Sequence, residues 1–183
     1  MKKSLKIALI TSVTVAFIFS FTLINKKVSA NSAVAVSYAD SKALNLVNEY
    51  RVQNGLSSLR WNDQLSAAAY LKAQDMVQNN YFEHVSPNGK TAWNFIDKSG
   101  YEYMKAGENL AIDFNSLDDT YKAWENSPSH RENLLSDNYT DFGFASTDGV
   151  IDGQKTTISV QIFASQMPIY DRVLSNLGGQ NGS

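Results

Sequence analysis

The sequence predicts a domain of the α+β class, because helical patterns come first along the chain and paired strands come last. Apolar residues recur at helical spacing from about residue 44 to residue 135, and strict alternation begins near Phe142. Helices followed by paired strands argue against a repeated βαβ unit. With 183 residues, 43% of them hydrophobic and 11% aromatic, the chain can also bury one core of ordinary size.

The first thirty residues are predicted to be a targeting segment. Met1–Lys6 carries three lysines, Ile7–Ile24 is apolar apart from Thr and Ser, and Val28-Ser29-Ala30 resembles a signal-peptidase site. We therefore expect residues 1–30 to be a cleaved signal peptide and the protein to be secreted. The apolar stretch also reaches the lower limit of a membrane-spanning length. An uncleaved N-terminal anchor, with the domain outside the cell, is the alternative.

The remaining chain divides into a linker, one domain and a tail. Residues 31–39 are mostly small residues such as Ala and Ser, which is typical of a linker. Residues 40–167 are predicted to form the domain. Residues 168–183 end in a run rich in Gly and Asn, so we expect a flexible C-terminal tail.

Five helices are predicted from their caps and their apolar spacing. Ser116 and Asp119 resemble a capping box, and Ser127 precedes a proline in the first helical position. Trp61, Trp93 and Trp124 are expected in the core. The predicted helices run from Asp40 or Ser41 to about Gln53, from Asn62 or Asp63 to Asn79, from Thr91 to Gly100, from Ser116 through Trp124, and from Pro128 to about Ser136.

The last part of the domain is predicted to be an antiparallel hairpin. Phe142 and Phe144 alternate with small residues, and Thr156–Phe163 alternates throughout. Asp148-Gly149 and Asp152-Gly153 indicate a turn region between the two strands. One face of the second strand should carry Ile158, Val160 and Ile162, and the other Thr157, Ser159, Gln161 and Phe163.

The charge of the chain disfavours nucleic acid as a partner. The sequence has 16 basic and 18 acidic residues, but five of the lysines lie in residues 1–30. The 11 basic and 18 acidic residues that remain give a net charge of −7. Polyanion-binding domains usually carry the opposite sign. The absence of cysteine from the sequence excludes thiol nucleophiles, thiolate metal ligands and disulfides.

Three polar residues are the candidates for a functional site. His84 and His130 are the two histidines of the sequence, and Glu108 lies between them in an apolar run. Two imidazoles and a carboxylate suit either a divalent metal with an open position or an acid/base pair. Their spacings of 24 and 22 residues match no local metal motif. The residues alone therefore leave a shared site and three separate structural roles equally open.

Five segments of the chain resemble the motifs of one family in the same order. The segments are Leu46–Arg51 with Gly55-Leu56 and Leu59–Trp61, then Phe82–Pro87, Gly107–Ala111, Trp124–Leu135, and Phe142–Phe144 with Val160–Ala164. This pattern resembles the CAP superfamily, which comprises the cysteine-rich secretory proteins, antigen 5 and pathogenesis-related 1 proteins. The resemblance extends from about Asp40 to Gln166.

The resemblance implies an α-β-α sandwich with a central antiparallel sheet between helical layers. It also implies an open cleft with two histidines and two acidic residues, which binds zinc or another divalent metal in some members. His84, Glu108 and His130 occupy matching positions. The second acidic position is not matched, and Glu125 is the nearest substitute. Pro128 interrupts the helix between Glu125 and His130, so periodicity does not place them on one cavity.

The expected function is that of a secreted binding module, because the domain is acidic and exported and its polar cleft has no recognisable nucleophile. Its partner is an unidentified extracellular or cell-envelope ligand, and it contacts a membrane only through an uncleaved N-terminal segment. The alternative is a zinc-dependent hydrolase of peptidase type, in which His84 and His130 hold the metal and Glu108 is the general base. If the protein is an enzyme, Glu108 and His130 are the candidate catalytic residues. Lipid binding is a lesser alternative.

Overall fold

Four strands form the central sheet in the computed structural model, which describes residues 41–171. The strands are β1 (Arg60–Trp61), β2 (Tyr103–Ile112), β3 (Asp141–Ile151) and β4 (Gln154–Gln166), in the order β1-β3-β4-β2. The three long strands are antiparallel, whereas the two residues of β1 pair in parallel with β3. The α+β class is confirmed. The sheet is mixed because Arg60-Trp61 adds a short parallel edge.

The predicted hairpin is formed by β3 and β4. Asp152 and Gly153 make the turn, both with positive φ. The turn prediction was wrong for Asp148-Gly149, which lies inside β3, with Gly149 opposite Thr156. A Cβ at Gly149 would lie 2.4 Å from a methyl carbon of Val77, so this glycine allows α2 to approach the sheet closely.

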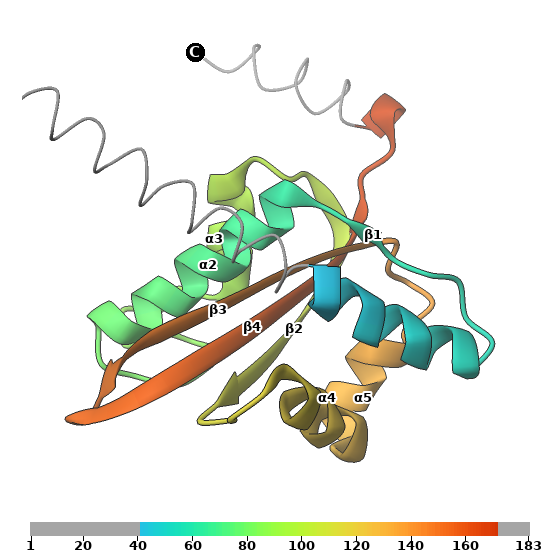
Figure 1. The fold of residues 1–183 in the computed structure, drawn as a ribbon. Coiled ribbons are helices and arrows are strands. Elements are labelled where there is room, and N and C mark those ends of the chain that lie inside the picture. The colour runs from blue at the N-terminus through green and yellow to red at the C-terminus, as the bar shows by residue number, and fades with distance from the viewer. Residues whose placement is uncertain (1–40, 172–183) are drawn as a thin grey trace, which may run out of the picture. The chain divides into compact units, whose positions relative to one another are not determined.

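Helices cover both faces of the sheet (Figure 1). On one face lie α2 (Asp63–Gln78) and α3 (Ala92–Ser99), and on the other lie helix 41–53, α4 (Leu117–Asn126) and α5 (Pro128–Leu135). The caps agree with the sequence. Asn62 accepts a hydrogen bond from Leu65 N, Ser116 accepts one from Asp119 N, and Gly100 ends α3 with positive φ. Ser127 separates α4 from α5 in an extended conformation.

The sheet divides the apolar interior into two clusters, because successive side chains of a strand point to opposite faces. Ile158, Val160 and Ile162 face α2 and α3, as predicted. Phe163 packs in the other cluster with Phe142, Trp124 and the residues of helix 41–53. The resulting α-β-α sandwich positions the edge strand β2 beside both the α2–α3 connection and α5.

The tryptophan prediction was only partly right. Trp124 is buried and donates from Nε1 to the carbonyl oxygen of Leu110. Trp61 is half-buried against Phe142. Trp93 is 38% exposed, because it lies on the outer side of α3 against Tyr103, so its assignment to the core was wrong.

The predicted signal peptide and linker lie outside the described residues, as does the tail from residue 172 onward. Residues 169–171 are helical at the end of the described range. No helix within residues 41–171 has the length and apolar character needed to cross a membrane.

Candidate functional site

His84 and Glu108 form a close pair beside the edge of the sheet. His84 lies in the loop between α2 and α3, Glu108 lies in β2, and Nδ1 of the histidine is 2.6 Å from Oε1 of the glutamate. The His84 side chain is 60% exposed, whereas that of Glu108 is only 4% exposed. When the carboxylate of Glu108 accepts this hydrogen bond, Nδ1 of His84 is the donor. The hydrogen bond to Glu108 raises the pKa of His84, although partial burial of the ring opposes the rise.

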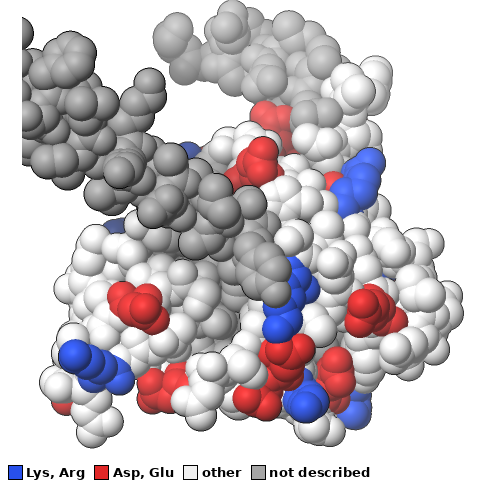
Figure 2. All heavy atoms as spheres, viewed as in Figure 1, with Lys and Arg blue, Asp and Glu red and all other residues white. Residues whose placement is uncertain are grey.

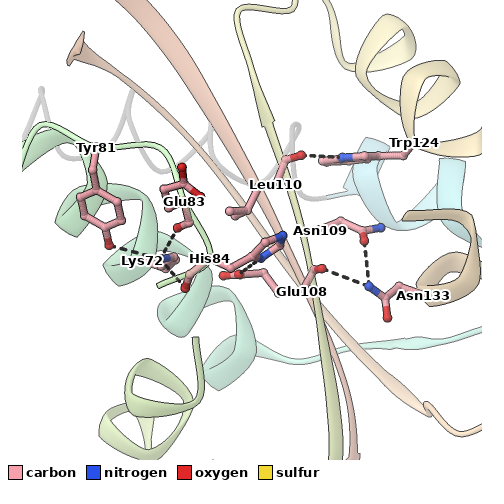
Figure 3. A network of polar contacts seen from close by, with 9 residues as sticks. All are labelled: Lys72, Tyr81, Glu83, His84, Glu108, Asn109, Leu110, Trp124 and Asn133. Atoms are coloured by element: carbon pink, nitrogen blue, oxygen red, sulfur yellow. Dashed lines mark hydrogen bonds and ion pairs between the residues drawn. The ribbon is translucent and has the colours of Figure 1, made fainter. Parts of the chain in front are cut away.

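Lys72 donates hydrogen bonds to the loop that carries His84 (Figure 3). This lysine is fully buried in α2, and its Nζ donates to the carbonyl oxygens of Glu83 and His84 at 2.8 and 3.0 Å. It also donates to Tyr81 Oη at 3.2 Å. Burial lowers the pKa of Lys72, and the negative charges nearby, that of Glu108 first, oppose this. The two bonds to carbonyl oxygens thus fix the main chain that carries the exposed imidazole.

Asn133 docks α5 against β2 on the other side of Glu108. Its Nδ2 donates to the carbonyl oxygen of Glu108 at 3.0 Å and to Oδ1 of Asn109 at 2.9 Å. Figure 3 shows Glu108 between His84 and Asn133, with its carboxylate toward His84 and its main-chain carbonyl toward Asn133. A Cβ at Gly107 would lie 2.6 Å from Asn133 Oδ1, so a larger residue here would force the Asn133 side chain to shift. The glycine before Glu108 is therefore explained by packing.

An open cleft of about 380 Å³ lies at this pair. Its volume is within the range of small-ligand sites. Glu108 Oε2 is buried and accepts no hydrogen bond from any residue within 41–171. The cleft is lined by His84, Val85, Thr91, Ala92, Trp93, Ala106, Gly107, Glu108 and Asn133.

A larger hollow, of about 920 Å³, lies where β2 ends beside the β3–β4 hairpin. Phe114 and Val150 are exposed there, and Asp113 and Asp148 accept hydrogen bonds from Thr156 and Thr157. None of the candidate residues from the sequence lines this hollow.

His130 lies near the pair but does not line the cleft. Burial lowers the pKa of His130, and the positive charge of His84 lowers it further. Its carbonyl oxygen accepts a hydrogen bond from Asn109 Nδ2 at 3.1 Å. Glu125 lies near the end of α4, where burial raises its pKa and the charge of Lys122 opposes the rise. The structure therefore joins His84 to Glu108, and His130 lies close enough for the charge of His84 to act on it.

The side chains of residues 41–171 do not offer a ready set of metal ligands. No three His, Asp or Glu side chains in this part of the chain are close enough together to hold an ion. The arrangement shown does not fit a metal centre with three protein ligands, and we derive no metal-dependent step from it.

The family of the chain follows from comparison with known proteins. The model of the cysteine-rich secretory protein family, CAP, matches residues 44–163. The chain belongs to the CAP family. The resemblance read from the five sequence motifs is thereby confirmed.

Three proteins illustrate the relatives of this CAP domain. Protein YkwD of Bacillus subtilis is 38% identical over 119 residues, which are 65% of this chain and 46% of YkwD. The membrane protein YlbC of the same organism is 32% identical over 105 residues, which are 57% of this chain and 30% of YlbC. The crystal structure of an extracellular SCP-domain protein from Bacillus anthracis has a TM-score of 0.60 and 30% identity. It covers 69% of this chain and 40% of that chain. The match thus spans less than half of each relative.

Three residues of the CAP-domain site were not predicted from the sequence. Lys72 lies among the buried residues of α2, and a lysine is almost never fully buried unless its ammonium group is paired. Trp93 was assigned to the core. Asn133 gave no signal, because its role depends on the contact between α5 and β2, which lie far apart in the sequence.

Proposed function

We propose that this CAP domain is an exported binding module that holds its ligand in the cleft beside His84 and Glu108. The observation that carries the proposal is an exposed imidazole fixed by a buried carboxylate at the mouth of an open cleft. Burial of a carboxylate costs free energy, and its bond to a largely exposed histidine returns little of that cost. Such pairs are typical of functional sites.

The place of action is the cell envelope or the medium beyond it. The Bacillus anthracis relative is described as extracellular, and the predicted signal peptide at residues 1–30 is consistent with export. YlbC is described as a membrane protein, which favours the alternative of an N-terminal anchor with the domain outside the cell.

The surface charge agrees with a partner that is not nucleic acid. The chain after residue 30 has a net charge of −7. On the face shown in Figure 2, acidic and basic side chains are interspersed. A surface of this kind offers no electrostatic advantage to a polyanion.

We also propose that the cleft binds a divalent metal such as zinc, either as the bound species itself or as an ion that helps to hold the ligand. His84 and His130 are the two residues proposed to contact it, with Glu108 beside His84 and no third protein ligand among the described residues. Metal content of the full-length protein by mass spectrometry tests this, with the His84→Ala/His130→Ala double variant as the comparison. A near-stoichiometric ion that the double variant loses would support a metal site and justify assays for the zinc-dependent hydrolase. If the protein holds no ion after incubation with zinc, both the metal site and the zinc-dependent hydrolase are excluded.

Cosedimentation with isolated cell envelopes tests the binding function. The full-length protein should sediment with the envelopes, and Glu108→Gln should reduce the bound fraction at least tenfold. Glu83→Gln is the matched control, because Glu83 is exposed and only its main-chain carbonyl takes part in the network. Equal sedimentation of the wild type and the Glu108→Gln variant would overturn the proposal.

A further inference from the structure

The edge strand β2 turns main-chain hydrogen-bonding groups away from the sheet. In an antiparallel pair, the N–H and C=O of one residue point to the partner strand, and those of the next point away. The carbonyl oxygens of Glu108 and Leu110 accept bonds from Asn133 and Trp124, which are not part of the sheet. Glu108 and Leu110 are therefore outward-facing residues, and Ala106 follows two positions earlier.

The register of the sheet supports this assignment. Ala106 lies opposite Ala164, whose carbonyl oxygen accepts a hydrogen bond from Thr140 N at 3.0 Å. That oxygen is directed toward β3, so it is not the partner of Ala106. At the other end of β2, Asp113 N donates to the carbonyl oxygen of Thr157, as an inward-facing residue should.

Three outward groups remain available at the cleft: the N–H and C=O of Ala106 and the N–H of Glu108. Within residues 41–171, no hydrogen bond outside the sheet ladder reaches them. Ala106 and Glu108 both line the cleft. Because β2 is the last strand of the sheet order, no further strand of residues 41–171 pairs with this edge.

We infer that the cleft binds an extended peptide segment, which pairs with the edge of β2 at Ala106 and Glu108. Two donors and one acceptor spaced as in a strand are complementary to the main chain of another strand. The exposed Trp93 and Val85 provide apolar contacts for the side chains of that segment. At about 3.4 Å per residue, a segment of roughly three residues covers this edge.

The inference deepens the proposed function, and rests on it, by naming the ligand as a peptide. Asn133 and Trp124 occupy the carbonyl oxygens of Glu108 and Leu110, so pairing ends at Glu108. The bound segment would therefore lie directly beside the His84–Glu108 pair, which would contact its side chain or its end.

The probe is the blocked peptide acetyl-Thr-Val-Ala-Val-Thr-amide, titrated into the ¹⁵N-labelled full-length protein. Its matched control is the same peptide with a methyl group on the central amide nitrogens, which removes donors and keeps the side chains. We expect the amide signals of Ala106 and Glu108 to shift downfield with the probe, and at least about tenfold weaker binding of the methylated peptide. Equal binding of the two peptides, or no shift with the unmodified one, would overturn the inference.

Two variants test the same edge from the protein side. Ala106→Pro removes an outward N–H without removing a bond of the sheet ladder, so the fold should persist and peptide binding should fall at least about tenfold. Trp93→Ala serves if that variant does not fold, and should weaken binding while the Glu108 amide still shifts. Unchanged binding in the folded variants would contradict strand pairing.

The result can be separated from that of the envelope experiment. If sedimentation depends on Glu108 but the peptide neither binds nor competes, the binding function stands and the peptide inference fails. If the peptide binds at β2 but sedimentation does not depend on Glu108, the proposed envelope function fails.

Discussion

Lys72 Nζ lies 3.0 Å from the carbonyl oxygen of His84, so a buried ammonium in α2 positions the exposed histidine of the cleft. The same nitrogen binds the carbonyl oxygen of Glu83 and the hydroxyl of Tyr81. Because Tyr81 Oη in turn donates to Asp75 Oδ2 at 2.7 Å, the buried charge is linked to a carboxylate through a neutral group. The cleft is thus built on a polar network that reaches into the core.

Replacement of Lys72 should destabilise the domain strongly. Lys72→Met keeps most of the apolar stem but leaves two main-chain carbonyl oxygens without their donor, so we expect a loss of about 3 kcal/mol in unfolding free energy. Urea denaturation measures it. Lys90→Met is the control, because Lys90 is half exposed and pairs with Asp75 at 3.5 Å, and it should cost less than about 1 kcal/mol. Equal losses in the two variants would contradict the role given to Lys72.

The pKa values of His84 and His130 should depart from that of an ordinary histidine in opposite directions. The pKa of His84 is raised by its bond to Glu108, and that of His130 is lowered by burial. NMR titration of the ring signals measures both values. Glu108→Gln should lower the pKa of His84 substantially, and Glu83→Gln should lower it less. A pKa of His130 above that of His84 would contradict the geometry.

These shifts also set the sign of the pH dependence of stability. The contribution of His84 is fully present below the ordinary histidine pKa and is lost as the pH rises through its raised folded-state pKa. The contribution of His130 has the opposite sign, because its pKa is lowered in the folded state. It is fully present above the ordinary histidine pKa and is lost as the pH falls toward the lowered value. The unfolding free energy of His84→Ala, compared with the wild type over this pH range, should show a difference that shrinks as the pH rises. A difference that grows with pH would contradict the assignment.

Gly107→Ala should weaken the contact between β2 and α5. The added Cβ would lie 2.6 Å from both Asn133 Oδ1 and Tyr139 Oη, so we expect a loss of about 1–3 kcal/mol. Thermal unfolding measures the loss, and the NMR signals of the Asn133 side-chain amide should shift. Gly89→Ala is the control, because Gly89 has positive φ but open space around it, and it should leave those signals in place. Unshifted Asn133 signals in Gly107→Ala would contradict the docking role.

The two tryptophans Trp93 and Trp124 should differ sharply. Trp124→Ala removes a buried ring and its bond to Leu110, and should cost about 3–5 kcal/mol of stability. Trp93→Ala removes a partly exposed ring and should cost about 1 kcal/mol, while ligand binding in the cleft falls. Denaturation and the envelope assay together measure both effects. A stable Trp93→Ala variant with unchanged binding would remove Trp93 from the site.

Local signals explain how much of the fold the sequence predicts. Caps such as Asn62 and Ser116 act within three residues, and the alternation in β4 records burial on both faces, so these elements were predicted well. The strand β2 was not predicted, because Gly107, Glu108 and Asn109 interrupt its apolar pattern. These three residues serve contacts with α5 and with the His84 loop.

The candidate site was predicted in part for the same reason. The chemistry of His84 and Glu108 drew attention to them, but the resemblance to a family, and not their spacing, indicated that they lie together. Lys72 and Asn133 act through main-chain carbonyl oxygens of residues far along the chain. Such contacts depend on tertiary packing, which composition and periodicity do not record.

Hydrogen exchange with and without envelope fragments tests most directly whether the His84 cleft is the binding site. Mass spectrometry of the full-length protein would compare exchange in residues 84–93 and 103–108 with exchange in the larger hollow around Phe114 and Val150. The account predicts that envelope fragments slow exchange in the first two segments and that Glu108→Gln abolishes the effect. Protection confined to the larger hollow, or protection that persists in Glu108→Gln, would contradict it.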